Sequence, residues 1–208
     1  MATRKSAARK SAAQKRGAPR LRAQAGSILT LKVTLKDIRP PIWRRVLVPG
    51  HATLGQLHDM LQASMGWGNG HIHQFTTGEV VYSAPWFELD AFGDEVEDER
   101  TVTVAEVLPR KGCRALYEYD FGDGWEHLLV VEKVGPAEAG VEAPLCVAGA
   151  RACPPEDSGG PWGYGELLEI LRNPQHAEHA ERLEWVGGRF DPEAFDLEAV
   201  NRRLRALR

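Results

Sequence analysis

Strand-like patterns fill most of this chain and helix-like patterns gather at its end, and this order restricts the fold more than any other feature. Apolar and polar residues alternate from 28 to 36, which is the period of a half-buried strand. Prolines at 40 and 41 end that pattern, and 42–48 predicts a second strand that pairs with the first as a hairpin. Further strands are predicted at 71–77, 80–82, 114–119 and 126–134.

Helix signals are clearest after the first hairpin and near the end of the chain. Thr53 and Gln56 have the spacing of a capping box, and they open an amphipathic helix that we expect to end near Gly66. Helices are also predicted at 163–172, 176–185 and 196–207, whereas 102–108 fits a short helix or a strand. The chain is therefore predicted to be α+β, a mostly antiparallel sheet with helices packed on one side. The first half is compatible with a β-grasp-like arrangement.

Two segments lack a regular period. Residues 88–100 are acidic, and we expect a loop there. Residues 136–162 are rich in proline and glycine and are predicted to form one long loop. Loops longer than about 12–15 residues are usually functional or disordered.

The charge is divided between a basic tail and an acidic body. Residues 1–26 hold almost no large apolar side chain and are predicted to be disordered, and 27–208 are predicted to form one domain. The tail has eight basic residues and no acidic one, so the rest of the chain holds 26 − 8 = 18 Lys and Arg against 29 Asp and Glu, or −11. The basic residues are Arg4, Lys5, Arg9, Lys10, Lys15, Arg16, Arg20 and Arg22.

Three interpretations of this tail remain open. It could bind nucleic-acid phosphates in a salt-sensitive way, it could only solubilise the chain, or it could be an organelle transit peptide. We expect no secretory signal and no membrane span, because no apolar run approaches the required length. Three cysteines make a disulfide framework improbable and favour the cytoplasm.

Several sequence phrases resemble the plasmid pRiA4b ORF-3-like family over about residues 28–207. They are Ile42-Trp43-Arg44-Arg45, Leu57-His58 with Met65-Gly66-Trp67, His71-Ile72-His73-Gln74-Phe75, Tyr117 to His127, and Cys146 to Gly149 with Arg151 to Tyr164. Members are mostly uncharacterised, and some are insertion-sequence passengers with a resolvase-like ("TnpR-like") name. The resemblance implies an accessory role, yet no serine-recombinase motif is present. Family members often have Cys where this chain has Ser158.

The turn at 120–127 is the strongest candidate for chemistry. It places Asp120, Asp123 and His127 within eight residues, a set that could bind a divalent metal or transfer protons. The alternative is structural, because Asp in a tight turn often bonds its own backbone and Gly supplies positive φ. Strand alternation also places Glu126 and His127 on opposite faces.

The long loop offers a second candidate. Cys146 and Cys153 are separated by six residues and followed by Glu156 and Asp157, a set that could bind zinc with a histidine such as His127 or His176. The plainer interpretation is that Cys153 packs as a small apolar residue. His71 and His73 lie two residues apart, so they would share one strand face, where they could ligate a metal or be merely structural.

Two function classes follow. The first is an accessory or binding protein that engages nucleic acid through the tail, or a protein partner through the long loop. The alternative is a metal-dependent, hydrolase-like enzyme that uses Asp120, Asp123, His127, Glu156 and Asp157. No P-loop, dinucleotide fingerprint, serine elbow or zinc-protease motif is present. The enzyme hypothesis requires residues 117–127 and 146–164 to meet in space.

Overall fold

The computed structural model describes residues 26–87 and 96–208, and its centre is an eight-stranded sheet. The strand order is β5-β4-β3-β6-β7-β1-β2-β8, and every neighbouring pair is antiparallel except β4 with β5. The strands are β1 (Ser27–Leu35), β2 (Trp43–Pro49), β3 (His73–Thr77), β4 (Val80–Ser83), β5 (Val96–Asp98), β6 (Arg114–Tyr119), β7 (Trp125–Pro136) and β8 (Leu145–Ala150). The predictions made for residues 1–25, and the part of the predicted acidic loop at 88–95, lie outside the described residues.

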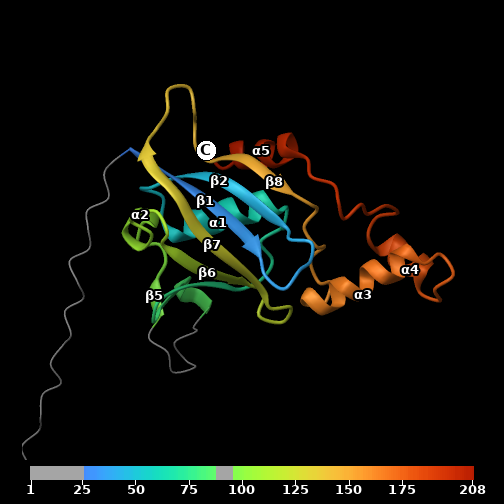
Figure 1. Cartoon of the computed structure of the whole chain (residues 1–208). Coiled ribbons are helices and arrows are strands. Elements are labelled where there is room, and N and C mark those ends of the chain that lie inside the picture. The colour runs from blue at the N-terminus through green and yellow to red at the C-terminus, as the bar shows by residue number, and fades with distance from the viewer. Residues whose placement is uncertain (1–25, 88–95) are drawn as a thin grey trace, which may run out of the picture.

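The helices confirm the α+β class. They are α1 (Leu54–Met65), α2 (Val104–Val107), α3 (Gly160–Arg172), α4 (His179–Trp185) and α5 (Leu197–Arg205), with a 3₁₀ turn at Pro85–Phe87. Helix α1 lies across one face of the sheet, α5 lies beside β8, and α3 and α4 extend beyond the sheet (Figure 1). No helix in the described ranges is long and apolar enough to cross a membrane.

The first hairpin and α1 form as their sequences predict. Strands β1 and β2 pair antiparallel from Ile28 with Pro49 to Thr34 with Trp43. The Thr53 side chain caps α1 in a complete capping box with Gln56, and α1 ends at Gly66 in the left-handed conformation. In the sheet, β1 lies between β2 and β7 and pairs antiparallel with both.

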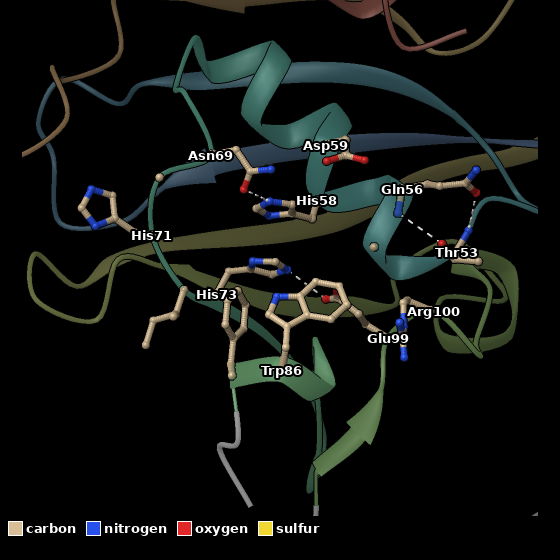
Figure 2. A pocket seen from close by; sticks show the side chains of 14 residues that line it. Thr53, Gln56, His58, Asp59, Asn69, His71, His73, Trp86, Glu99 and Arg100 are labelled. Atoms are coloured by element: carbon tan, nitrogen blue, oxygen red, sulfur yellow. Dashed lines mark hydrogen bonds and ion pairs between the residues drawn. The ribbon is translucent and has the colours of Figure 1, made fainter.

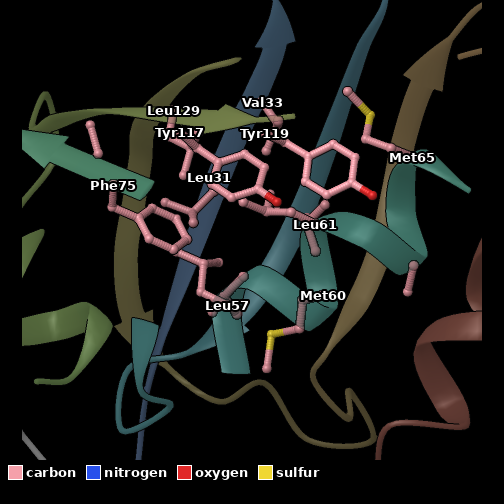
Figure 3. Packing of buried hydrophobic residues seen from close by; sticks show 14 of the residues in the cluster. Leu31, Val33, Leu57, Met60, Leu61, Met65, Phe75, Tyr117, Tyr119 and Leu129 are labelled. Atoms are coloured by element: carbon pink, nitrogen blue, oxygen red, sulfur yellow. The ribbon is translucent and has the colours of Figure 1, made fainter. Parts of the chain in front are cut away.

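The core lies between α1 and the sheet, where every second residue along the central strands is buried. Leu57 and Leu61 of α1 pack toward Leu31 and Leu129 of the sheet (Figure 3). Each of these leucines is at most 1% exposed. Burying one such side chain contributes on the order of 1.5–3 kcal/mol, so this layer fixes the position of α1 over the strands.

Two segments predicted to be loops contain strands. Residues 96–98 of the acidic segment form β5, which pairs parallel with β4. Residues 145–150 of the proline- and glycine-rich segment form β8, which pairs with β2. Neither strand shows an alternating period, because β5 has three residues and β8 is an edge strand whose pairing depends on its neighbours.

The edge strand β8 is held by α5. The Asn201 side chain accepts a hydrogen bond from the Cys146 amide at 2.7 Å and donates one to the Cys146 carbonyl at 2.9 Å. It thereby satisfies backbone groups that an edge strand would otherwise leave unpaired. The loop that follows β8 therefore starts from a fixed point.

Candidate functional site

The Asp-rich turn and the proline- and glycine-rich loop meet in space. The Gly159 amide donates to Asp123 Oδ2 at 3.1 Å. Gly160 has φ +68, and a Cβ there would lie 2.2 Å from the Asp123 carbonyl oxygen. Only glycine fits this contact, so the two segments are packed backbone against backbone.

A third segment, residues 67–71 after α1, closes the junction. Trp67 Nε1 donates to the Pro154 carbonyl at 2.9 Å. Glu156 accepts from the Tyr119 hydroxyl at 2.5 Å and from the Gly68 amide at 3.0 Å. Burial, followed by the bond to Glu156, raises the pKa of the Tyr119 hydroxyl, which keeps it a donor. Both oxygens of Glu156 are thus used to hold the three segments together.

Asp120 bonds the backbone of its own turn and also presents one carboxylate oxygen to His71. Its backbone is left-handed at φ 56, and its Oδ1 accepts hydrogen bonds from the amides of Gly122 at 3.0 Å and Asp123 at 3.3 Å. This is the turn geometry expected of an aspartate. Its other oxygen, Oδ2, lies 3.6 Å from His71 Nδ1.

His71, Asp120 and Asp157 form a cluster that could hold a metal ion, and we call it the surface trio. His71 Nε2 lies 3.2 Å from Asp157 Oδ1. One ligand atom from each residue lies within 4.8 Å of the others. The side chains of His71, Asp120 and Asp157 are 32%, 12% and 72% exposed, so the cluster is open to solvent. One imidazole and two carboxylates suit a divalent cation such as zinc or manganese.

His127 lies apart from the surface trio. It is fully buried, and its Nδ1 contacts the carbonyls of Trp125 at 3.1 Å and Tyr117 at 3.3 Å. Its ring meets Trp67 edge-on at 5.2 Å between centroids. Burial lowers the pKa of His127 to about 4, so the ring is neutral at pH 7. These contacts make His127 a core residue.

The cysteines also lie outside the trio. Cys146 is buried in β8, and its thiol contacts the Ala148 carbonyl at 3.3 Å. Cys153 is half-buried, and burial raises the pKa of its thiol to about 12. Within the described ranges, the groups gathered at metal-binding distances contain neither thiol, so the cysteine zinc site stays a prediction without a ligand set.

A pocket of about 480 Å³ borders the surface trio and includes His71 in its lining. Figure 2 shows it between α1, the chain entering β3, the 3₁₀ turn and the end of β5. Its most unusual feature is a stacked pair of histidines, His58 and His73, with ring centroids 3.5 Å apart and planes 6° apart. His71 lies away from this pair at one end of the view.

A closed ring of hydrogen bonds fixes His58. Gln62 Nε2 donates to the Tyr117 hydroxyl at 3.0 Å, and that hydroxyl donates to His58 Nδ1 at 2.7 Å. His58 Nε2 donates to the side-chain oxygen Oδ1 of Asn69 at 2.5 Å, and the backbone amide of Asn69 donates to Gln62 Oε1 at 3.0 Å. Burial, with the neighbouring His73, lowers the pKa of His58 to about 3. His58 is therefore neutral, with its proton on Nε2.

His73 pairs with a buried acid. Its Nε2 lies 2.9 Å from Glu99 Oε2, and the two residues are 3% and 2% exposed. His73 Nδ1 has no hydrogen-bond partner within residues 26–87 and 96–208. A buried carboxylate needs such a partner to offset its lost hydration. The two histidines of the His-x-His phrase thus have separate partners, since His71 faces Asp120 and Asp157.

Sequence reasoning missed the pocket and Glu99. Glu99 follows the short strand β5, inside a segment predicted to be an acidic loop. The one signal available was His58, a histidine within the apolar stripe of a capped helix. Leu57 and Met60, two nearby apolar residues of the same helix, are buried. A polar residue on a buried helix face needs a partner, which the sequence does not identify.

The comparisons with known proteins find a family model, a curated relative and a solved structure that resemble this chain. The model of the family "Plasmid pRiA4b ORF-3-like protein" matches residues 27–199. The uncharacterized protein y4hQ of Sinorhizobium fredii (strain NBRC 101917 / NGR234) is 42% identical over 183 residues, which cover 87% of this chain and 92% of that protein.

A solved structure is similar in sequence and in fold. The crystal structure of MM3350, a protein of unknown function from Methanosarcina mazei Go1, has a TM-score of 0.74 and 39% identity, and the match covers 83% of this chain and 96% of that one. A match over residues 27–199 includes the sheet, the Asp-rich turn and the long loop. The chain therefore belongs to the plasmid pRiA4b ORF-3-like family.

Proposed function

We propose that this protein is a metal-dependent enzyme of the hydrolase type whose divalent cation binds at the surface trio. The observation that carries the proposal is the convergence of His71, Asp120 and Asp157 from three distant segments, with ligand atoms within 4.8 Å. The hydrolase hypothesis required the turn and the long loop to meet, and their packing at Gly160 supports that requirement.

The charge of the trio suits a divalent cation. Asp120 and Asp157 carry two negative charges beside one imidazole, so a bound 2+ ion balances them. Three protein ligands leave coordination positions for water and substrate, and a bound divalent ion lowers the pKa of such a water. Asp123 and Glu156 belong to the proposed site as positioning residues, because their carboxylates fasten the loop that carries Asp157.

The adjoining pocket supplies what a metal ion alone lacks, a place for substrate. His71 is part of the pocket lining and also faces both aspartates, so the pocket and the proposed cation site share this residue. A pocket of this volume is within the range of small-molecule sites. A small-molecule substrate is therefore more compatible with this geometry than a long polymer.

Metal titration tests the proposal. We expect Zn²⁺ or Mn²⁺ to bind the full chain with one-to-one stoichiometry in calorimetry, and Asp157→Asn to weaken binding at least about tenfold, because it removes one charged ligand. Glu181→Gln, an exposed acid on α4, is the matched control and should bind like wild type. The p-nitrophenyl esters of acetate and phosphate then report metal-dependent hydrolysis.

Two results would contradict the metal site. One is no saturable binding of either ion at millimolar concentration. The other is equal affinity of wild type and Asp157→Asn, which would place the ion elsewhere. Metal binding without hydrolysis of any ester would leave a metal-binding protein and reject the enzyme.

The accessory role, with nucleic acid bound by the tail, stays a prediction. The tail residues that would contact phosphates lie outside the described ranges, and the rest of the chain carries −11 by formal charge. The test is a gel shift with the full chain and with a chain lacking residues 1–26. Salt-dependent binding lost on truncation would establish this role beside the metal site.

A further inference from the structure

The pocket beside the surface trio has a distinct set of walls. Trp86, Phe87 and Ile72 supply apolar surface. The stacked rings of His58 and His73 form another part of the lining (Figure 2), and the His73 ring meets the Phe87 ring edge-on at 5.4 Å between centroids. Trp86 is 62% exposed, which is a large apolar surface to leave in water. Aromatic walls with a few polar groups are the usual composition of a small-molecule site.

Most polar atoms inside the pocket are already bonded. Both nitrogens of His58 have partners, and His73 Nε2 is paired with Glu99. These groups fix the shape of the pocket, because moving any of them would leave a buried polar atom unsatisfied. Among the described residues, the polar atom of the histidine pair left without a partner is His73 Nδ1, which is buried. The groups at the rim therefore remain for a charged ligand.

Asp59 is the rim group that lacks a partner. It projects from α1 into the lining of the pocket and, among the described residues, makes no hydrogen bond or ion pair. Burial and the nearby Glu99 raise the pKa of its carboxyl, and a smaller attraction to His73 acts in the opposite direction.

Of the described residues, Arg100 alone brings a guanidinium to the lining, and it does not neutralise Asp59. Arg100 donates from Nε and Nη2 to the two oxygens of Asp98, at 2.9 and 2.8 Å. Its guanidinium also lies 5.1 Å from the centre of the Trp86 ring. The Arg100 charge is thus balanced, and with His58 neutral the Asp59 end of the pocket keeps a net negative charge.

We propose that this pocket binds a small organic cation, a primary ammonium on a planar apolar body, with the ammonium at Asp59 and the body toward Trp86 and Phe87. The ammonium provides a positively charged partner for the Asp59 carboxylate, and the apolar body covers the exposed indole of Trp86. If the surface trio holds a metal, this cation is the substrate class of the proposed enzyme. The binding itself requires no metal ion.

Benzylamine is a suitable probe, with benzyl alcohol and benzoate as neutral and anionic analogues of similar shape. We expect saturable calorimetric or saturation-transfer NMR binding of benzylamine to the full chain in EDTA, and at least about tenfold weaker binding of both analogues. Asp59→Asn should weaken benzylamine about tenfold, and Asp59→Glu should retain much of the affinity. Trp86→Ala should weaken it about threefold to tenfold.

The controls separate this inference from the metal site. Glu181→Gln, at an exposed position outside the pocket, should bind benzylamine like wild type, and thermal unfolding verifies that each variant is folded. If metal titration fails while benzylamine still binds, only the proposed enzyme is lost. Equal binding of benzylamine and benzyl alcohol, or unchanged binding by Asp59→Asn, would overturn the cation site. Absence of saturable benzylamine binding would overturn it as well.

Discussion

The surface trio and the buried pair of His73 with Glu99 both place a histidine against a carboxylate, but in opposite surroundings. In the trio, His71 faces Asp120 and Asp157 in a solvent-open cluster built on loops. In the pair, His73 faces Glu99 with both side chains at most 4% exposed, and the residues come from β3 and the end of β5.

The difference between them is whether the polar atoms are already used. His58 is held in a closed ring with Gln62, Tyr117 and Asn69. Removing one member of such a network leaves buried polar atoms of the others without hydrogen-bond partners, so the network helps to specify the fold. The carboxylate atoms of the trio that face His71 can instead exchange it for a cation at little cost to the fold. We therefore expect the pair to control stability and the trio to control binding.

The largest expected effect is on the buried pair. His73→Leu leaves Glu99 without a partner in a site that is 2% exposed, and we expect a loss of about 3–5 kcal/mol in the free energy of unfolding. Urea denaturation of wild type and variant measures this loss. In the double variant His73→Leu with Glu99→Gln, the buried charge is absent, and part of the stability should return.

A loss below about 1 kcal/mol for His73→Leu would break the comparison. It would mean that Glu99 gains solvent or another partner, and the buried pair would then resemble the trio in its tolerance.

The second effect is a dependence of stability on pH. The folded-state pKa values of His58 and His127, about 3 and about 4, lie below the ordinary value of 6.5. The unfolded chain therefore binds protons that the folded chain excludes. The stabilisation of the fold by the two neutral rings is complete above pH 6.5. As the pH drops toward 4, the free energy of unfolding falls by up to about 2.7 kcal/mol per pH unit for the two rings together.

Urea denaturation at pH 7, 6, 5 and 4.5 measures that slope. His127→Leu should flatten it by about half, because one of the two excluded protons is gone, whatever the variant does to absolute stability. An unchanged slope would show that His127 is not buried in its neutral form.

The sequence predicted the parts of the fold that carry their own periodicity. Strand β1 buries every second residue, and α1 has a capping box and a left-handed glycine at its end. Strand β8 has no such period, and it is a strand because β2 offers an open edge and Asn201 bonds its backbone. A pattern within one segment cannot report a partner more than fifty residues away.

The same limit explains the site. The phrases that contain Asp120 and Asp157 were recognised, and their contact was the condition set for an active site. His71 was paired with His73 because two-residue spacing predicts one strand face, but β3 begins at His73, so the alternation does not extend to His71. Glu99 was missed because its neighbour His73 is 26 positions earlier in the chain.

A smaller loss is expected within the hydrogen-bonded ring. Tyr117→Phe removes the hydroxyl that links Gln62 to His58 and leaves two buried polar atoms without a partner. We expect a loss of about 1–3 kcal/mol in the free energy of unfolding, measured by urea denaturation. Phe75→Leu, a neighbouring core change that removes no hydrogen bond, separates packing from hydrogen bonding. If both variants unfold alike and His58 keeps its tautomer by NMR, the ring does not hold His58.

The smallest change in stability is expected at the surface trio, where it completes the contrast. Asp157 is 72% exposed, and its ion pair with His71 lies in solvent, so Asp157→Asn should alter the free energy of unfolding by no more than about 0.5 kcal/mol. The same substitution should remove most of the metal affinity. A site that binds a cation separates the two effects in this way, whereas a structural ion pair does not. A loss of stability comparable to that of Tyr117→Phe, with metal binding intact, would make the trio a fastening of the loop like Glu156, and the two regions would then have the same role.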